Sequence, residues 1–179
     1  MYIRFFESFS HFIHTMIRIL LSVIFSFAML AGCSQSPSSN APSTVPEFTF
    51  FVAQTNQPVM RTSLAIEGNT VFMFFDTGCI HCRNEMVLMG DNFDQFKNAT
   101  FYLVSQQDKG IVDDFMNTYG QKIKDKPNVH VLLDRNYEFL AKFKPVQYPA
   151  MYVYGPDRKL KTYLDGENDL NTLISAINN

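Results

Sequence analysis

Hydrophobic and polar positions follow two different patterns along the chain, and the pattern changes near residue 47. After that point, short apolar runs alternate with segments of helical period. The clearest run is residues 71–75 (VFMFF), which predicts a strand buried on both faces. A helical stripe follows it, formed by Cys82, Met86, Met89, Phe93 and Phe96.

The same alternation continues to the C-terminus and indicates one domain. Residues 155–159 (GPDRK) separate two apolar runs and predict a β-hairpin, and a last amphipathic stripe predicts a closing helix. Strands that alternate with helices favour an α/β fold with a mixed central sheet flanked by helices. The expected strands are 47–54, 71–75, 100–105, 129–133, 150–154 and 160–164, and the expected helices begin near residues 80, 111, 137 and 170.

The N-terminal third has the pattern of an export signal. Residues 17–31 are almost wholly apolar, and Arg4 and Arg18 supply a basic flank. The run is too short for a comfortable membrane span but fits a signal peptide. Met16 is an alternative start to Met1, because it would open a signal of ordinary length.

The apolar run ends in Leu-Ala-Gly-Cys at Cys33, which resembles the bacterial lipobox. The resemblance implies cleavage before Cys33 and acylation of its sulfur and new amino group. The alternatives are an ordinary cleavage site that happens to precede a cysteine, or a weak membrane anchor. Ser34 follows, where lipoproteins retained at the inner membrane often carry Asp, so the resemblance favours the outer membrane of a Gram-negative bacterium, facing the periplasm.

These features divide the chain into a signal peptide at 1–32, a lipidated cysteine and flexible tether at 33–46, and a folded domain at 47–179. Residues 34–46 are rich in Ser and Pro and carry no charge, which is typical of a tether. The net charge is only −2 and no basic stripe is present, so nucleic acid is not expected as a partner. The membrane is expected as a partner through the N-terminal lipid.

Candidate chemistry lies directly after the buried strand, in Cys79-Ile80-His81-Cys82. Lipidation of Cys33 would leave these as the two remaining thiols of an exported chain. The start of a helix carries partial positive charge and free N–H groups, which favour thiolate over thiol. Cys79 sits at the exposed end of the helix and is the expected nucleophile, and Cys82 would resolve the mixed disulfide.

Other uses of the cysteine pair fit less well. A structural disulfide that closes so small a ring would constrain the chain little. Zinc needs a second pair of ligands. Haem attachment needs His directly after the second cysteine, where this chain has Arg83.

The combination of motifs resembles the thioredoxin-fold thiol–disulfide oxidoreductases of the TlpA/ResA type. The matching parts are the apolar strand, the segment 79–85 (CIHCRNE) and Tyr148-Pro149 before the hairpin. The resemblance covers about residues 46–179 and implies a thioredoxin fold with an inserted helix and strand within 110–133. The sequence departs from it at Gly78, where the family usually has Trp, and cytoplasmic thioredoxins have a buried Asp in place of Met73.

The resemblance also implies roles for four further residues. His81 would tune the couple, and Glu85 would handle protons near Cys82, although a carboxylate that merely favours the helix dipole is the alternative. Pro149 would be cis and, with Tyr148, would leave a backbone edge for substrate. A His between the cysteines goes with oxidising couples, whereas the family type implies a reductant, and we favour a reductase.

The sequence therefore predicts a periplasmic, lipid-anchored thiol–disulfide oxidoreductase that acts on protein thiols and disulfides and needs no bound cofactor or metal. Two other classes stay open. Cys79, Cys82 and His130 could bind copper in a delivery module, and the fold could serve as a non-catalytic binding domain.

Overall fold

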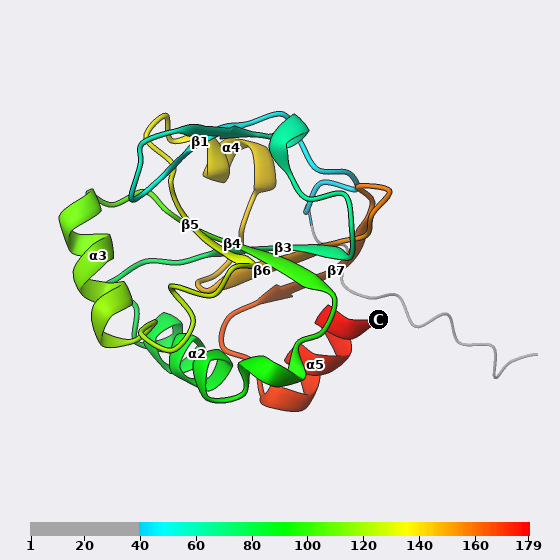
Figure 1. Cartoon of the computed structure of the whole chain (residues 1–179). Helices are drawn as coiled ribbons and strands as arrows, with labels where there is room; N and C mark the ends of the chain where they lie inside the picture. The colour runs from blue at the N-terminus through cyan, green and yellow to red at the C-terminus, as the bar shows by residue number, and fades with distance from the viewer. Residues whose placement is uncertain (1–39) are drawn as a thin grey trace, which may run out of the picture. The chain divides into compact units, whose positions relative to one another are not determined.

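The computed structural model describes residues 40–179, shown in colour in Figure 1. The predicted signal peptide and Cys33 lie outside these residues. The strands are β1 (Thr49–Val52), β2 (Pro58–Met60), β3 (Asn69–Phe74), β4 (Ala99–Ser105), β5 (Val129–Leu133), β6 (Ala150–Tyr154) and β7 (Leu160–Asp165). The helices are α2 (Ile80–Asp91), α3 (Lys109–Thr118), α4 (Glu138–Phe143) and α5 (Leu170–Asn178), and 3-10 turns form at η1 (Arg61–Ser63) and η2 (Phe93–Gln95).

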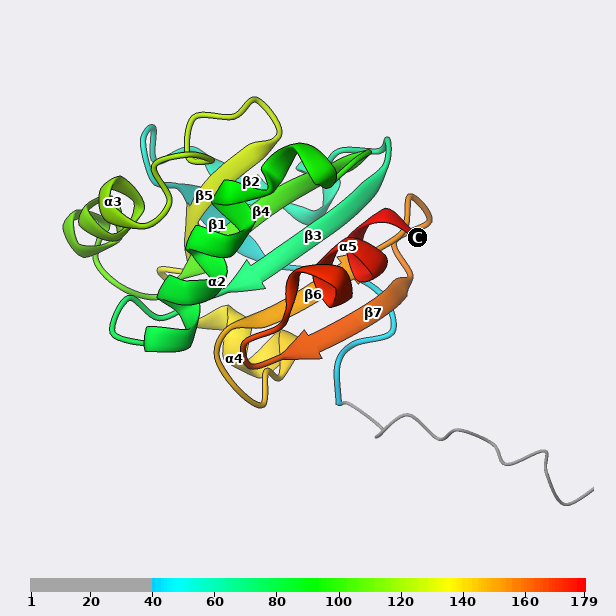
Figure 2. The same cartoon turned by 90° about the horizontal axis from the view of Figure 1, so that it is seen from below.

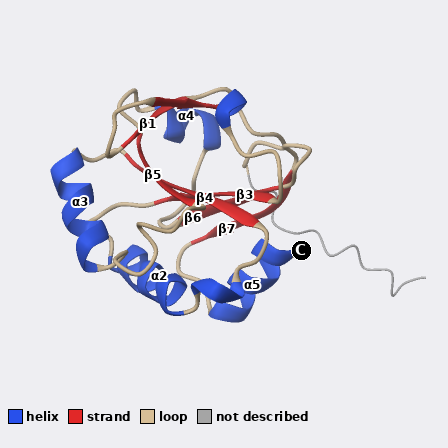
Figure 3. Ribbon diagram, in the orientation of Figure 1, coloured by secondary structure: helices blue, strands red, loops and turns tan. Residues whose placement is uncertain are grey.

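These strands form one mixed sheet in the order β2-β1-β5-β4-β3-β6-β7. The three central strands β3, β4 and β5 are parallel, whereas β1, β2, β6 and β7 pair antiparallel with their neighbours. Helices α2 and α5 cover one face and α4 covers the other (Figures 1 and 2). The predicted thioredoxin-like α/β fold is confirmed, and Figure 3 shows its helices on both sides of the sheet.

Strand β3 explains the unbroken apolar run, because its two faces enter two separate cores. Val71 and Met73 pack with α2, α3 and α5, and Phe72 and Phe74 pack with α4. Successive side chains of a strand point to opposite faces, so the part of a strand that has helices on both sides is apolar at successive positions, as residues 71–74 of β3 are. The central strand is thereby fixed in depth and register, and with it the loop that follows.

Two local details differ from the sequence pattern. Helix α2 ends at Asp91, and the last members of the predicted stripe, Phe93 and Phe96, lie in and after η2, although both are buried. The segment 57–66, which the pattern left undefined, contributes β2 as an edge strand paired with β1. The sheet therefore has one more strand than expected.

The folded domain also begins earlier than residue 47. Thr44 forms an isolated bridge with Lys159, and the Val45 N–H donates to the Arg158 carbonyl at 3.0 Å. The Val45 side chain is buried. The last part of the predicted tether is thus docked on the hairpin before β7, because Val45 supplies an apolar side chain that the Ser-rich composition around it obscures. Within residues 40–179 the structure has no helix with the length and apolar character of a membrane span.

Asp134 should stabilise α4 measurably. Its buried carboxylate accepts from the N–H groups of Glu138 and Phe139 at 2.9 and 2.8 Å, and from the Gln106 side chain at 2.8 Å. Asp134→Ala should lower the free energy of unfolding by about 1–3 kcal/mol, because these donors lose their acceptor. Urea denaturation measures the change. Asp114→Ala, at an exposed site on α3, is the control, and an equal loss in both variants would contradict the capping role.

Candidate active site

Cys79 occupies the junction between β3 and α2, as the sequence predicts. It is the N-cap residue of α2 and is partly exposed. Its Sγ lies 3.8 Å from the main-chain carbonyl oxygen of Tyr148. The sulfur is therefore accessible at the positive end of a helix, beside the loop that leads into β6.

Cys82 lies one turn further along α2 and is fully buried. Burial raises the pKa of its thiol, and the neighbouring Cys79 adds to the increase, while a hydrogen bond from the Asp76 main chain acts against it. The two thiols are free in this structure. They thus differ in environment in the way that a nucleophile and a resolving thiol would require: one is open and the other is held in the core.

The loop before β6 brings Tyr148 and Pro149 to the cysteine pair. The Tyr148–Pro149 peptide bond is cis, as the resemblance implies. The Tyr148 ring packs against Phe74 at the end of β3, with 5.3 Å between ring centroids. Residues nearly seventy positions apart in sequence therefore meet at Cys79.

Glu85 is buried completely on α2, three residues after Cys82. One carboxylate oxygen accepts from the Asn168 N–H at 2.8 Å, and the other, Oε1, has no hydrogen-bond partner. Burial raises the pKa of this carboxyl group from 4.5 to about 7, although the Asn168 hydrogen bonds act against the increase. Glu85 lies beyond the first turn of α2, so the helix-dipole alternative does not account for its position.

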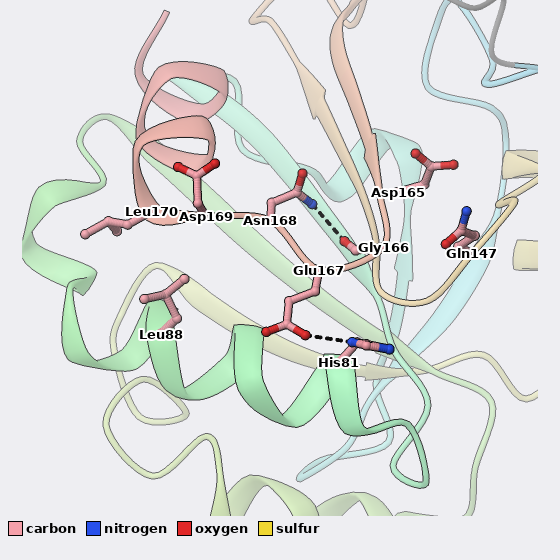
Figure 4. Close-up of a pocket in the computed structure, with 9 residues that line it drawn as sticks. All are labelled: His81, Leu88, Gln147, Asp165, Gly166, Glu167, Asn168, Asp169 and Leu170. Carbon is pink, nitrogen blue, oxygen red and sulfur yellow. Dashed lines mark hydrogen bonds and ion pairs between the residues drawn. The ribbon is translucent and has the colours of Figure 1, made fainter.

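His81 points to the loop between β7 and α5. Its Nδ1 lies 2.6 Å from Glu167 Oε2, and the Asn84 side chain donates to the same oxygen at 3.2 Å. Figure 4 shows this pair at the edge of an open hollow of about 770 Å³. The remaining wall of the hollow comes from Leu88, Gln147 and residues 165–170.

Sequence reasoning missed Glu167 and Asn168, which lie in the loop between β7 and α5 and contact side chains of α2. The Asn168 side chain donates to the Gly166 carbonyl at 2.7 Å, which holds the loop in shape (Figure 4). Adjacent residues of one loop therefore contact His81 and Glu85, which lie on either side of Cys82 in the sequence. In the sequence, the only signal for these two residues is their position just before the last predicted helix.

His130 does not join the cysteine pair. It lies on β5, and its ring stacks on Tyr102 of β4 with 5.1 Å between centroids. Burial lowers its pKa. Among residues 40–179 no three or more His, Cys, Asp or Glu side chains gather in a way that could hold a metal ion, so the structure does not assemble the copper set considered above.

Solved structures share this fold. The chain is similar to dsbF of Mycobacterium tuberculosis, with 22% identity, a TM-score of 0.63, and coverage of 75% of this chain and 98% of that one. A secreted disulfide oxidoreductase of the same organism matches with 20% identity, a TM-score of 0.60 and coverage of 73% and 94%. A thio-disulfide isomerase from Thermus thermophilus matches with 22% identity, a TM-score of 0.60 and coverage of 77% and 94%.

At these identities the likeness establishes the fold. Among curated proteins none matches the sequence significantly. The family comes from a different comparison, in which residues 42–163, more than half of the chain, match the family described as AhpC/TSA. The resemblance to TlpA/ResA-type proteins is thus confirmed at the level of fold and family, and the chain belongs to the AhpC/TSA family.

Proposed function

We propose that this AhpC/TSA-family protein is a thiol–disulfide oxidoreductase that exchanges disulfides with client proteins through Cys79 and Cys82, and that it works as a reductase. The observation that carries the proposal is the pairing of an accessible sulfur at the start of α2 with a buried thiol one turn away. Disulfide exchange needs these two environments, because one thiolate must reach a client and the other must wait for the mixed disulfide.

In the reducing direction the Cys79 thiolate attacks a client disulfide. A bond forms between Cys79 and one client sulfur, and the other client sulfur leaves as a thiolate and takes up a proton. The Cys82 thiolate then attacks Cys79, which releases the second client thiol and forms the Cys79–Cys82 disulfide. Two electrons pass to the client, and a dithiol protein must return two electrons to the pair.

Glu85 would handle the proton of Cys82 in the second step. The two residues are three apart on α2 and therefore lie on one face of the helix. Burial raises the pKa values of both groups. A carboxyl group with a pKa of about 7 can both accept and return a proton at neutral pH, which suits a general acid–base role.

Tyr148, Pro149 and His81 are the other residues with expected roles. The cis Tyr148–Pro149 segment would present its backbone to the client, with the Tyr148 carbonyl 3.8 Å from Cys79 Sγ. His81 would tune the couple from α2, and its bond with Glu167 fixes the orientation of the ring. No bound cofactor takes part in this scheme.

For localisation we propose the periplasm of a Gram-negative bacterium, with Cys33 lipidated and the outer membrane as the favoured site. The lipobox-like sequence before Cys33 and Ser34 after it support this proposal. One structural neighbour is a secreted disulfide oxidoreductase, which is consistent with export.

The variant Cys82→Ser should trap clients. Without the resolving thiol, the mixed disulfide on Cys79 persists, so non-reducing gels of cell extracts should show several-fold more adducts than wild type, and reductant should remove them. The double variant Cys79→Ser, Cys82→Ser is the control and should trap nothing. A Cys82→Ser protein without adducts would argue for a non-catalytic binding domain.

If Cys33 is lipidated, it should take up a fatty-acid label. In a Gram-negative host fed labelled palmitate, the full-length wild type should carry the label and Cys33→Ser should lose it, because the acyl chains are built on that residue. Cys79→Ser should keep the label and serves as the matched cysteine control. If the wild type stayed unlabelled, the segment before Cys33 would be an ordinary signal peptide and not a lipoprotein signal.

Glu85 predicts a pH dependence of stability. The pKa of Glu85 is about 7 in the folded state, against an ordinary value of 4.5. The protonated group therefore stabilises the folded state fully below pH 4.5, and this stabilisation is lost as the pH rises through 7. The loss is of the order of 3 kcal/mol. Urea denaturation of Glu85→Gln should show a flatter decline over this interval than wild type or the exposed control Glu67→Gln, and parallel curves would refute the raised pKa.

A further inference from the structure

Asp76, in the loop between β3 and α2, is a charged residue of the site that the exchange scheme does not use. Its Oδ1 accepts from the Gly78 N–H at 2.7 Å, and its main-chain carbonyl accepts from the Cys79 N–H at 3.2 Å. The carboxylate is therefore bound to the loop that carries the nucleophile. Asp76 lies three residues before Cys79 and six before Cys82.

A second contact, from a residue that follows the neighbouring strand β4, holds the Asp76 carboxylate in place. Gln107, just after β4, donates to Asp76 Oδ2 at 3.1 Å and accepts from the Thr77 N–H at 2.9 Å. The same side-chain oxygen, Gln107 Oε1, also accepts from the Ser105 hydroxyl at 3.1 Å. Both oxygens of Asp76 thus have donors, and the carboxylate cannot turn away from the loop without breaking one of these bonds.

Gly78 leaves the space that the carboxylate occupies. A Cβ atom added there would lie 3.1 Å from Asp76 Oδ1, closer than most Cβ contacts. A side chain at residue 78 would therefore press on Asp76. The Asp76 carboxylate can lie close to the loop because Gly78, the residue before Cys79, has no side chain.

This arrangement makes the loop less favourable to a thiolate. The N–H groups of Thr77, Gly78 and Cys79 donate to Gln107 and Asp76, so none of them points freely at a sulfur. The negative charge of Asp76 also adds to the causes, led by burial, that raise the pKa values of Cys82 and Tyr148. Both effects oppose the positive end of α2.

We propose that Asp76 makes the Cys79–Cys82 couple more reducing, because its carboxylate disfavours the thiolate form of the reduced pair. Reduction of the disulfide takes up two electrons and two protons when both sulfurs become thiols, but only one proton when one sulfur stays a thiolate, and this second product carries a negative charge that the disulfide lacks. A fixed negative charge nearby raises the energy of that product. The inference rests on the proposed function and favours its reducing direction.

The test is the reduction potential of Asp76→Asn, measured at pH 8 and low salt by equilibration with glutathione buffers. Removal of the charge should favour the dithiol about three- to tenfold, and tenfold corresponds to a potential about 30 mV less negative. Asp114→Asn removes the same charge from an exposed site on α3 and should leave the potential unchanged. The difference between wild type and Asp76→Asn should shrink in 1 M salt, because screening weakens a partly exposed charge.

A second variant separates charge from loop structure. Gln107→Leu breaks the brace but keeps the carboxylate and its bond with the Gly78 N–H, so its potential should lie closer to wild type than to Asp76→Asn. A Gln107→Leu shift equal to that of Asp76→Asn, or an unchanged potential in Asp76→Asn, would overturn the inference while wild type still exchanges with glutathione. A wild type that does not exchange with glutathione would overturn the proposed function itself.

Discussion

The site depends on one constraint, which is that every loop around Cys79 leaves the sheet at the same edge. Because β3, β4 and β5 are parallel, the loops after them emerge together. Strand β6 is antiparallel to β3 and starts opposite Phe74, and β7 ends opposite that start, at Asp165. The cysteine loop, Gln107, the cis-proline loop and the loop that carries Glu167 are thereby delivered to one place.

The two apolar cores maintain this arrangement. Residues of β3 alternate between the core beneath α2 and the core beneath α4, and all six positions of the strand are buried. A shift of register by one residue would exchange every side chain between two cores of different shape. The depth of the strand therefore fixes how far Cys79 projects and how deeply Cys82 and Glu85 are buried.

Opposed electrostatic effects then act on two sulfurs a single turn apart. The start of α2 favours negative charge at Cys79, whereas burial of Cys82 and the carboxylate of Asp76 disfavour negative charge at Cys82. A buried carboxyl group with a pKa near neutrality stands beside them. In the proposed exchange, which consumes protons with electrons, this carboxyl group would supply protons to the sulfurs.

The sequence by itself determined the elements and the motif. These are local patterns: the run at 71–75, the hairpin around residues 155–159 and the Cys-x-x-Cys at a strand-to-helix junction. They can be read from the sequence because the alternation of apolar side chains and the choice of turn residues depend on near neighbours in the chain. Only the tertiary structure decided that Glu167 binds His81, that Gln107 braces Asp76 and that Val45 docks on the hairpin. These contacts join polar residues or isolated apolar ones across long sequence separations, and such pairs have no periodicity from which they could be predicted.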